Sequence, residues 1–186
     1  MGLNVVEENQ KLQPPQPINP DHLLEDFDSG DADLNDWLRR RAIRNEDSGA
    51  SRTYVVTVRQ KVIAYYCLAT GNVLSSIAPG RVRRNMPDPI PVMVIGRLAV
   101  DCNWHGKGVG RGLVRDAVLR TVQAAQIAGI RAILVHAISE EAKKFYEKCG
   151  FISSPVAPMT MLVTVADAPS SFGYCGVVFV ATSFLL

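Results

Sequence analysis

The 186-residue chain has few cysteines and no long apolar run, and both absences limit what it can be. Its four cysteines are scattered, with no C-x-x-C pair and no His/Cys cluster, so neither a zinc site nor a disulfide framework is expected. No stretch reaches the roughly 20 apolar residues of a membrane helix, and the acidic N-terminus lacks the apolar core of a signal peptide. These absences predict a cytoplasmic protein with no bound metal and no membrane contact.

Acidic side chains are concentrated at the beginning of the chain. Residues 1–36 contain nine acidic side chains and one lysine, a net charge of −8, whereas the whole chain has a net charge of +2. Residues 37–186 therefore carry +10, mostly as arginine. Hydrophobic residues make up 47% of the chain, which is enough for the core of one folded domain. The asymmetry predicts a basic surface on that domain.

Composition divides the chain into three segments. Residues 1–20 are polar and rich in proline, and we expect a flexible leader with room for one short strand. Residues 21–166 form the predicted domain. Residues 167–186 form an apolar tail that is too short to span a membrane. Three interpretations of this tail stay open: an additional strand, part of a dimer interface, or a non-native extension.

Hydrophobic periodicity predicts the order of helices and strands. Helices are expected over 31–47, 109–128 and 139–148, and strands over 53–58, 62–69, 92–100, 130–138, 151–152 and 159–165. The first two strands are close enough for an antiparallel hairpin. Gly96 interrupts the third strand and predicts a bulge or a close backbone approach. Because one helix joins two later strands, the order predicts an α/β (α+β) fold, a mixed and mostly antiparallel sheet flanked by helices.

A glycine-rich loop at residues 104–112 (WHGKGVGRG) follows a predicted strand and opens a predicted helix. Glycines let the backbone approach a ligand, and the free N–H groups of a first helical turn favour a diphosphate. The P-loop pattern G-x-x-x-x-G-K-[ST] is absent. A Rossmann pattern is also disfavoured, because the strand after the helix does not end in the acidic residue that would bind a ribose.

The loop resembles the acetyl-CoA signature of the GNAT acetyltransferases, R/Q-x-x-G-x-G/A, with His105 at the first position. Residues 27–165 more widely resemble the TacT-type GNAT toxins of bacterial type II toxin–antitoxin systems, notably in the segments 83–91 (RRNMPDPIP) and 96–101 (GRLAVD). The resemblance implies a GNAT fold with a βαβ acetyl-CoA-binding crossover.

The same resemblance implies an activity and a set of partners. Such toxins move acetyl from acetyl-CoA to the α-amine of aminoacyl-tRNA, which blocks translation. They act as homodimers, are neutralised by a ribbon-helix-helix antitoxin, and reach operator DNA only through the complex with that antitoxin.

The match to the family's motifs implies which residues act. Tyr146 occupies the position of the catalytic tyrosine. The implied acetyl-CoA contacts are Leu98, Ala99, Val100, His105, Gly106, Lys107, Gly108, Val109, Gly110, Arg111 and Ser139. A phosphate-rich acceptor fits the arginines of the first helix and of the long loop, and these are Arg39, Arg40, Arg44, Arg81, Arg83 and Arg84.

Acyl transfer needs a neutral amine, a stabilised oxyanion and a proton for the leaving thiolate. A backbone N–H near Val100 suits the oxyanion, and Tyr146 suits the proton. No general base is evident, because His136 on its apolar strand is more typical of a hydrogen-bonded core histidine. An α-amine with a pKa of roughly 7.7–8.0 is about a quarter neutral at physiological pH without help, whereas a lysine is almost fully charged. The missing base therefore favours an α-amine acceptor.

Some alternatives stay open at this stage. The chain can be a general GNAT acetyltransferase of a small amine or a protein N-terminus, or a non-catalytic binding module. Arg97 can pair with an acid or remain unpaired. Trp37 and Tyr65 are expected to pack in the core rather than to stack on a nucleotide base.

Overall fold

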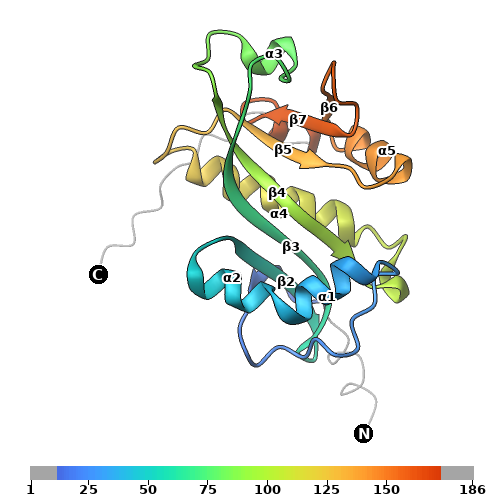
Figure 1. Cartoon of the computed structure of the whole chain (residues 1–186). Helices are drawn as coiled ribbons and strands as arrows, with labels where there is room; N and C mark the ends of the chain where they lie inside the picture. Colours follow the sequence, from blue (N-terminus) through green and yellow to red (C-terminus); the bar gives the residue numbers. More distant parts are fainter. Residues whose placement is uncertain (1–11, 173–186) are drawn as a thin grey trace, which may run out of the picture.

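A computed structural model describes residues 12–172, and its centre is a seven-stranded mixed sheet with the order β1-β2-β3-β4-β5-β7-β6 (Figure 1). Neighbouring strands are antiparallel except β4 and β5, which are parallel. The strands are β1 (Gln16–Pro17), β2 (Arg52–Val58), β3 (Lys61–Val73), β4 (Ile90–Val100), β5 (Ala132–His136), β6 (Ile152–Ser153) and β7 (Thr160–Thr164). The fold class predicted from periodicity is therefore confirmed.

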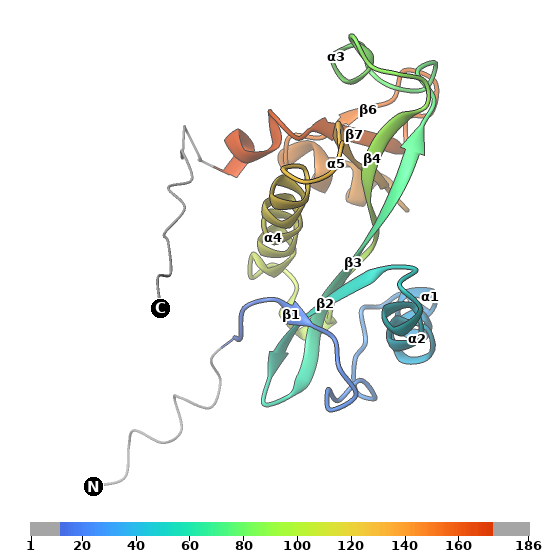
Figure 2. The same ribbon diagram turned by 90° about the vertical axis from the view of Figure 1, so that its left-hand side faces the viewer.

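Helices cover both faces of the sheet, as Figure 2 shows when the sheet is seen nearly edge-on. On one side lie α1 (Ala32–Arg40) and α2 (Ala42–Ser48), and on the other lie α4 (Val109–Ala124) and α5 (Glu140–Lys148). The short α3 (Gly80–Arg83) sits at the far end of the β3–β4 hairpin. The sheet thus separates the face of α1 and α2, here called the α1 face, from the opposite α4 face.

Strand alternation sends side chains to each of these faces. On β3, Tyr66 and Leu68 belong to the core cluster under α4, whereas Tyr65 and Cys67 belong to the cluster under α1. Trp37 and Tyr65 are 7% and 0% exposed, so the expectation that both rings pack in the core is confirmed. Each face therefore has its own apolar core.

The sheet splits along β4. This strand pairs with β3 from Ile90 to Val100 but with β5 only from Val92 to Ile95, so its last five residues have no β5 neighbour. The β3–β4 register shifts between Leu68↔Ile95 and Cys67↔Arg97, which leaves Gly96 as the bulged residue. The bulge expected at Gly96 is confirmed, and it lies where β4 leaves β5.

Some element limits differ from the sequence expectation. The helix predicted over 31–47 is two helices that break at Arg41, whose φ of −122° lies outside the helical range, and the break lets Ala42 pack with no exposed surface. The expected short strand in the leader is β1, which pairs with β2. Packed structure also continues beyond residue 166, since Ala168 is only 1% exposed. Residues 1–11 of the leader and 173–186 of the tail lie outside the described residues.

Candidate active site

A groove of about 690 Å³ lies on the α4 face at the end of β4. It is lined by the end of β4, the glycine-rich loop, the first turn of α4 and one side of α5. The lining residues are Leu98, Ala99, Val100, Trp104, His105, Gly106, Gly108, Val109, Gly110, Arg111, Glu141, Ala142 and Phe145. Nine of the eleven residues that the sequence suggested for acetyl-CoA are among them; Lys107 and Ser139 are not.

The glycine-rich loop takes a backbone path that favours glycine. Gly106 and Gly108 have φ values of +72° and +78°, the left-handed region that side chains with a Cβ rarely occupy. Gly108 is the N-cap of α4, and the first intrahelical bond runs from Gly112 N–H to its carbonyl. The N–H groups of the preceding turn, at Val109 and Gly110, are therefore available to an anion at the positive end of the helix dipole.

The free edge of β4 also presents a backbone donor. Asp101 N–H donates to the Ile63 carbonyl on β3, whereas the Val100 carbonyl accepts from His105 Nε2 at 2.7 Å. N–H and C=O of one strand residue point the same way. The Val100 N–H therefore points to the edge that β5 has left. The sequence placed its expected oxyanion donor near this same residue.

Four predicted cofactor residues have side chains that contact other parts of the protein. The Lys107 ammonium lies 4.7 Å from the centroid of the Trp104 ring. The Ser139 hydroxyl caps α5 by accepting from Ala142 N–H. His105 lines the groove, and its ring Nε2 donates to the Val100 carbonyl of β4. Arg111 lines the groove with its guanidinium 5.4 Å from the Phe172 ring centroid.

Tyr146 lies on α5, next to Phe145, which lines the groove. Its ring is 8% exposed and packs edge-on against Phe145 and Phe151. Burial, with a smaller contribution from Cys149, raises the pKa of this phenol above its usual value. Tyrosine is protonated at neutral pH even at its ordinary pKa, and burial favours this neutral form further, so Tyr146 is suited there to a proton donor rather than a base.

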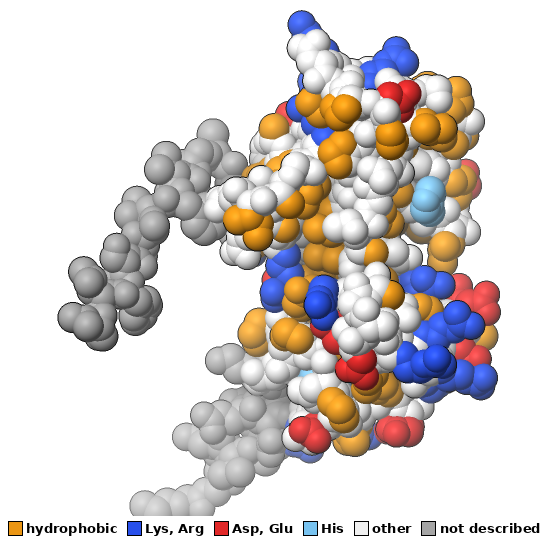
Figure 3. All heavy atoms as spheres, turned by 60° about the vertical axis from the view of Figure 1, so that its left-hand side comes forward, with side chains coloured by type: hydrophobic (Ala, Val, Ile, Leu, Met, Phe, Trp, Pro, Cys, Tyr) orange, Lys and Arg blue, Asp and Glu red, His pale blue; other side chains and the backbone are white. Residues whose placement is uncertain are grey.

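The predicted basic residues fall into two separate groups, as the space-filling view shows (Figure 3). One gathers over α1 and α2, and the other lies around α3 at the far end of the β3–β4 hairpin. The sequence suggested both sets for one acceptor without placing them. In the folded chain they are two surfaces.

In the α1–α2 group the arginines differ in their partners. Arg39 donates to the backbone carbonyls of Leu24, Glu25 and Phe27. Arg40 forms an exposed ion pair with Asp36 at 3.5 Å. A hollow of about 880 Å³ is lined by Arg40, Arg41, Arg44, Asn45, Asp47 and Ser48. Arg41 was not singled out from the sequence, because it lay near the apolar side of one continuous predicted helix.

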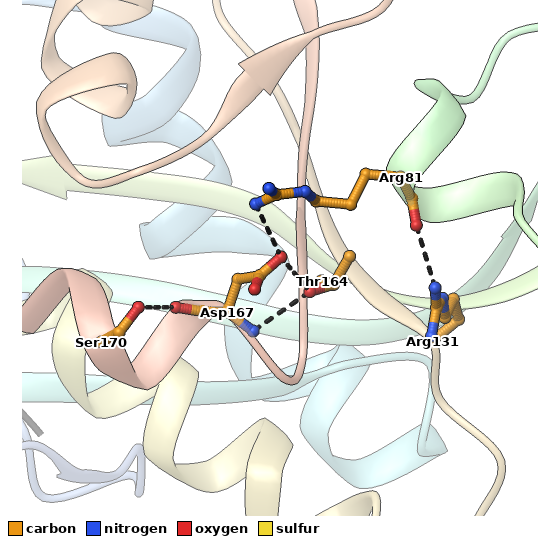
Figure 4. A network of polar contacts seen from close by, with 5 residues as sticks. All are labelled: Arg81, Arg131, Thr164, Asp167 and Ser170. Atoms are coloured by element: carbon orange, nitrogen blue, oxygen red, sulfur yellow. Dashed lines mark hydrogen bonds and ion pairs between the residues drawn. The ribbon is translucent and has the colours of Figure 1, made fainter. Parts of the chain in front are cut away.

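In the α3 group Arg81 is held in a polar network (Figure 4). Its guanidinium lies 3.3 Å from Asp167, which also accepts from the Thr164 hydroxyl. Arg131 donates to the carbonyls of Arg81 and Val82 and so fixes α3 on the sheet. Arg83 and Arg84 are exposed and form no ion pair within residues 12–172. The sequence gave no signal for Arg131, whose role depends on a distant loop.

The expectation of a core histidine at position 136 is wrong. His136 is exposed at the end of β5, where β4 has already diverged, and its Nδ1 lies 3.1 Å from the Thr160 hydroxyl. Burial was expected because the strand is apolar, but His136 is the last residue of β5 and, unlike the four residues before it, is not buried.

Two kinds of feature are not found in the part of the chain that the structure describes. No helix there is both long and apolar enough to cross a membrane. Across the same residues, no three His, Cys, Asp or Glu side chains are grouped so as to hold a metal ion.

A split β4, a glycine loop at a helix start and an apolar groove between them define an acyltransferase that binds a CoA thioester. The chain belongs to the GNAT acetyltransferases, since residues 49–153 match the family described as "Acetyltransferase (GNAT) domain". It is therefore an acetyltransferase.

Two relatives extend this family assignment. The chain is 48% identical over 147 residues, 79% of this chain and 89% of the relative, to a "tRNA-acetylating toxin" of Mycobacterium tuberculosis (strain ATCC 25618 / H37Rv). It is 25% identical over 170 residues, 85% of this chain and 94% of the relative, to a "Probable toxin TacT" of Sinorhizobium fredii (strain NBRC 101917 / NGR234).

Solved structures of similar toxins share the fold. AtaT complexed with acetyl-methionyl-tRNAfMet matches with a TM-score of 0.79 and 26% identity, covering 87% of this chain and 99% of that one. AtaTR bound with AcCoA matches with a TM-score of 0.74 and 26% identity, covering 89% and 99%. A tyrosine-to-phenylalanine mutant of AtaT bound to the C-terminus of the antitoxin AtaR shares the fold, with a TM-score of 0.74 and 24% identity, over 89% and 99%.

Proposed function

We propose that this protein is a toxin that transfers acetyl from acetyl-CoA to the α-amine of aminoacyl-tRNA and thereby blocks translation in the cytoplasm. The observation that carries the proposal is the groove at the split of β4, which joins a diphosphate site to an exposed backbone donor. The relative named as a tRNA-acetylating toxin supports the choice of acceptor.

Acetyl-CoA is proposed to bind with its diphosphate on the backbone N–H groups at the start of α4. Its thioester arm then runs along the free edge of β4, where Leu98, Ala99 and Val100 line the groove. The Val100 N–H stabilises the oxyanion that forms when the amine attacks the thioester carbonyl. The side chains of Lys107 and Ser139 are proposed to hold the loop and α5 in place rather than to contact acetyl-CoA. The Lys107 ammonium lies over the Trp104 ring, and the Ser139 hydroxyl caps the N-terminus of α5.

Tyr146 is proposed as the general acid. When the tetrahedral intermediate collapses, the carbon–sulfur bond breaks, and the phenol gives its proton to the leaving thiolate. A phenol is protonated at neutral pH even at its ordinary pKa, so Tyr146 has a proton to give. The neutral α-amine of the acceptor attacks without an assigned base, as its low intrinsic pKa allows.

The two basic surfaces are proposed to bind the tRNA backbone. Arg40, Arg44, Arg83 and Arg84 are exposed and suited to phosphates. Arg81 shares its charge with Asp167, and Arg39 is engaged by three carbonyls, so we expect less binding energy from these two. Homodimer formation, neutralisation by a ribbon-helix-helix antitoxin and operator binding through that antitoxin belong to the same proposal. The proposed domain of residues 21–166 is extended at its two ends by β1 and by the packed segment around Ala168.

Incubation with acetyl-CoA and total aminoacyl-tRNA tests the proposal. After nuclease digestion, mass spectrometry of the released aminoacyl nucleosides should show an added acetyl group on at least one of them. The Gly108→Asp variant, which places a carboxylate in the diphosphate site, is the control and should give no acetylated product. Acetyl-CoA turnover on small amines without any acetylated aminoacyl nucleoside would contradict the proposed acceptor while leaving the acetyltransferase intact.

A further inference from the structure

Arg97 stands at the split of the sheet without an assigned role. It follows the Gly96 bulge on β4, pairs with Cys67 of β3, and lies just beyond Ile95, the last β4 residue that pairs with β5. Two residues further along, Ala99 lines the groove proposed for acetyl-CoA. Arg97 is therefore adjacent to the place where the thioester would react, and it is exposed.

The Arg97 side chain lies on the α1 face, opposite the glycine-rich loop. Leu98 and Val100 pack with the core under α4, and strand alternation sends Arg97 to the other side. Its guanidinium carbon lies 5.0 Å from the centroid of the Trp37 ring, which belongs to the core under α1. The two faces of the split thus carry different groups: backbone donors on the α4 face and a cation on the α1 face.

The surface beneath the guanidinium is formed by two stacked aromatic rings and one hydrogen bond. Trp37 is 7% exposed and stacks on Tyr65 with ring centroids 5.7 Å apart and planes 11° apart. The Tyr65 hydroxyl donates to the Leu34 carbonyl at 2.8 Å, which fixes the stack to α1. A guanidinium that rests on a ring by its face keeps the N–H donors at its rim for another partner.

The charge of Arg97 is not neutralised within the described residues. No carboxylate there lies within the 4.0 Å of an ion pair with it, so the open question from the sequence is answered in favour of an unpaired arginine. Asp31 begins the same helix as Trp37, but its carboxylate caps that helix by accepting from Leu34 N–H. An exposed, unpaired and pre-oriented guanidinium at a reactive gap is suited to a phosphate.

The position of Arg97 relative to the groove indicates whether it would bind a phosphate of acetyl-CoA or a phosphate of the acceptor. The groove for the thioester and its diphosphate lies on the α4 face, so a group bound by Arg97 on the other side of the gap does not compete with acetyl-CoA for space. In an aminoacyl-tRNA, the last phosphodiester of the chain is separated from the reacting amine by only a ribose and an ester. We infer that Arg97, supported by Trp37, binds this last phosphodiester and so positions the amine at the split; the inference rests on the proposed acceptor.

Acceptors with and without the phosphate provide the test. Arg97→Gln and Arg97→Lys are compared with wild type and with Arg59→Gln, a control at the exposed β2–β3 turn, on aminoacyl-tRNA and on a 3′-aminoacyl adenosine that has no phosphate. Arg97→Gln should raise KM for aminoacyl-tRNA about tenfold or more, with Arg97→Lys in between. KM for acetyl-CoA and the rate on aminoacyl adenosine should match wild type, as should all parameters of Arg59→Gln.

Two results would overturn the assignment of Arg97. One is wild-type KM for aminoacyl-tRNA in Arg97→Gln, and the other is an equal loss on aminoacyl adenosine, which indicates that the arginine supports the strand or stacks on the base. A wild-type protein that acetylates neither acceptor, yet turns over acetyl-CoA with another amine, refutes the proposed acceptor itself, and the inference falls with it. The thermal midpoint of each variant shows whether it is folded.

Discussion

At the scale of single residues, position in the fold decides whether a side chain reacts or only packs. Tyr146 combines both, since its ring is buried between Phe145 and Phe151 while its proposed work is done by one hydroxyl. Removing that oxygen leaves the packing of the ring in place. The two contributions can therefore be separated in a single variant.

Tyr146→Phe should lower kcat for acetyl transfer by about 10²–10⁴-fold, because the leaving thiolate loses its proton donor. The affinity for acetyl-CoA, measured by calorimetry, and the thermal midpoint should change little. A variant with wild-type kcat would remove Tyr146 from the mechanism.

Gly108→Ala should weaken the diphosphate site through the backbone. The φ of +78° costs a residue with a Cβ about 1–2 kcal/mol, although nothing lies within 4 Å of the added atom. We expect a lower free energy of unfolding and weaker acetyl-CoA binding by calorimetry. Gly112→Ala is the matched control: it also meets nothing within 4 Å, but lies inside α4, where alanine is favoured over glycine by about 0.5–1 kcal/mol. Equal effects of the two changes would contradict this explanation.

At the scale of elements, α1 shows that neighbouring arginines can have different tasks. Arg39 bridges from α1 to the segment before it through three carbonyls, whereas Arg40 has only an exposed ion pair within its own helix. The sequence presents them as one basic run. Their separation depends on the path of residues 24–27, which no local pattern predicts.

Arg39→Ala should therefore lower the free energy of unfolding by roughly 1–3 kcal/mol, since charge-assisted hydrogen bonds to backbone carbonyls are lost. Arg40→Ala should change it by less than about 0.5 kcal/mol, as exposed ion pairs contribute little. Urea unfolding of the two variants checks the difference. A stable Arg39→Ala protein with weakened tRNA binding would instead place Arg39 on the acceptor surface.

At the scale of the whole molecule, the two basic surfaces stand at different ends of the sheet (Figure 3). Groups that are far apart and share no partner act additively. A tRNA is large enough to contact both at once. The proposed acceptor thus predicts an additive and salt-dependent contribution from each surface.

The double variants Arg40→Gln/Arg44→Gln and Arg83→Gln/Arg84→Gln should each reduce the salt slope of aminoacyl-tRNA binding by about 1–2. Combined, the reductions should add. Binding titrations over a range of salt concentrations measure these slopes, and acetyl-CoA affinity is the control. An unchanged slope in either double variant would show that its surface does not contact the acceptor.

Local patterns in the sequence were enough to predict most of the backbone. The strands β3 and β4, the Gly96 bulge and the glycine loop before α4 follow from rules that involve a few neighbouring residues, and the family motif indicated Tyr146. The break at Arg41 and the exposed His136 were not predicted, because packing against a distant element determines both.

What the sequence by itself determined is the order of elements, the helix start that can hold a diphosphate, and the family. Only the tertiary structure decided which charges are available. In the folded chain Arg39 donates to backbone carbonyls, and Arg81 forms an ion pair with Asp167. The Arg97 guanidinium lies over the Trp37 ring, beside the open edge of β4. The physical reason is that backbone conformation depends on near neighbours, whereas the partner of a long charged side chain is selected by folding from residues far away in the chain.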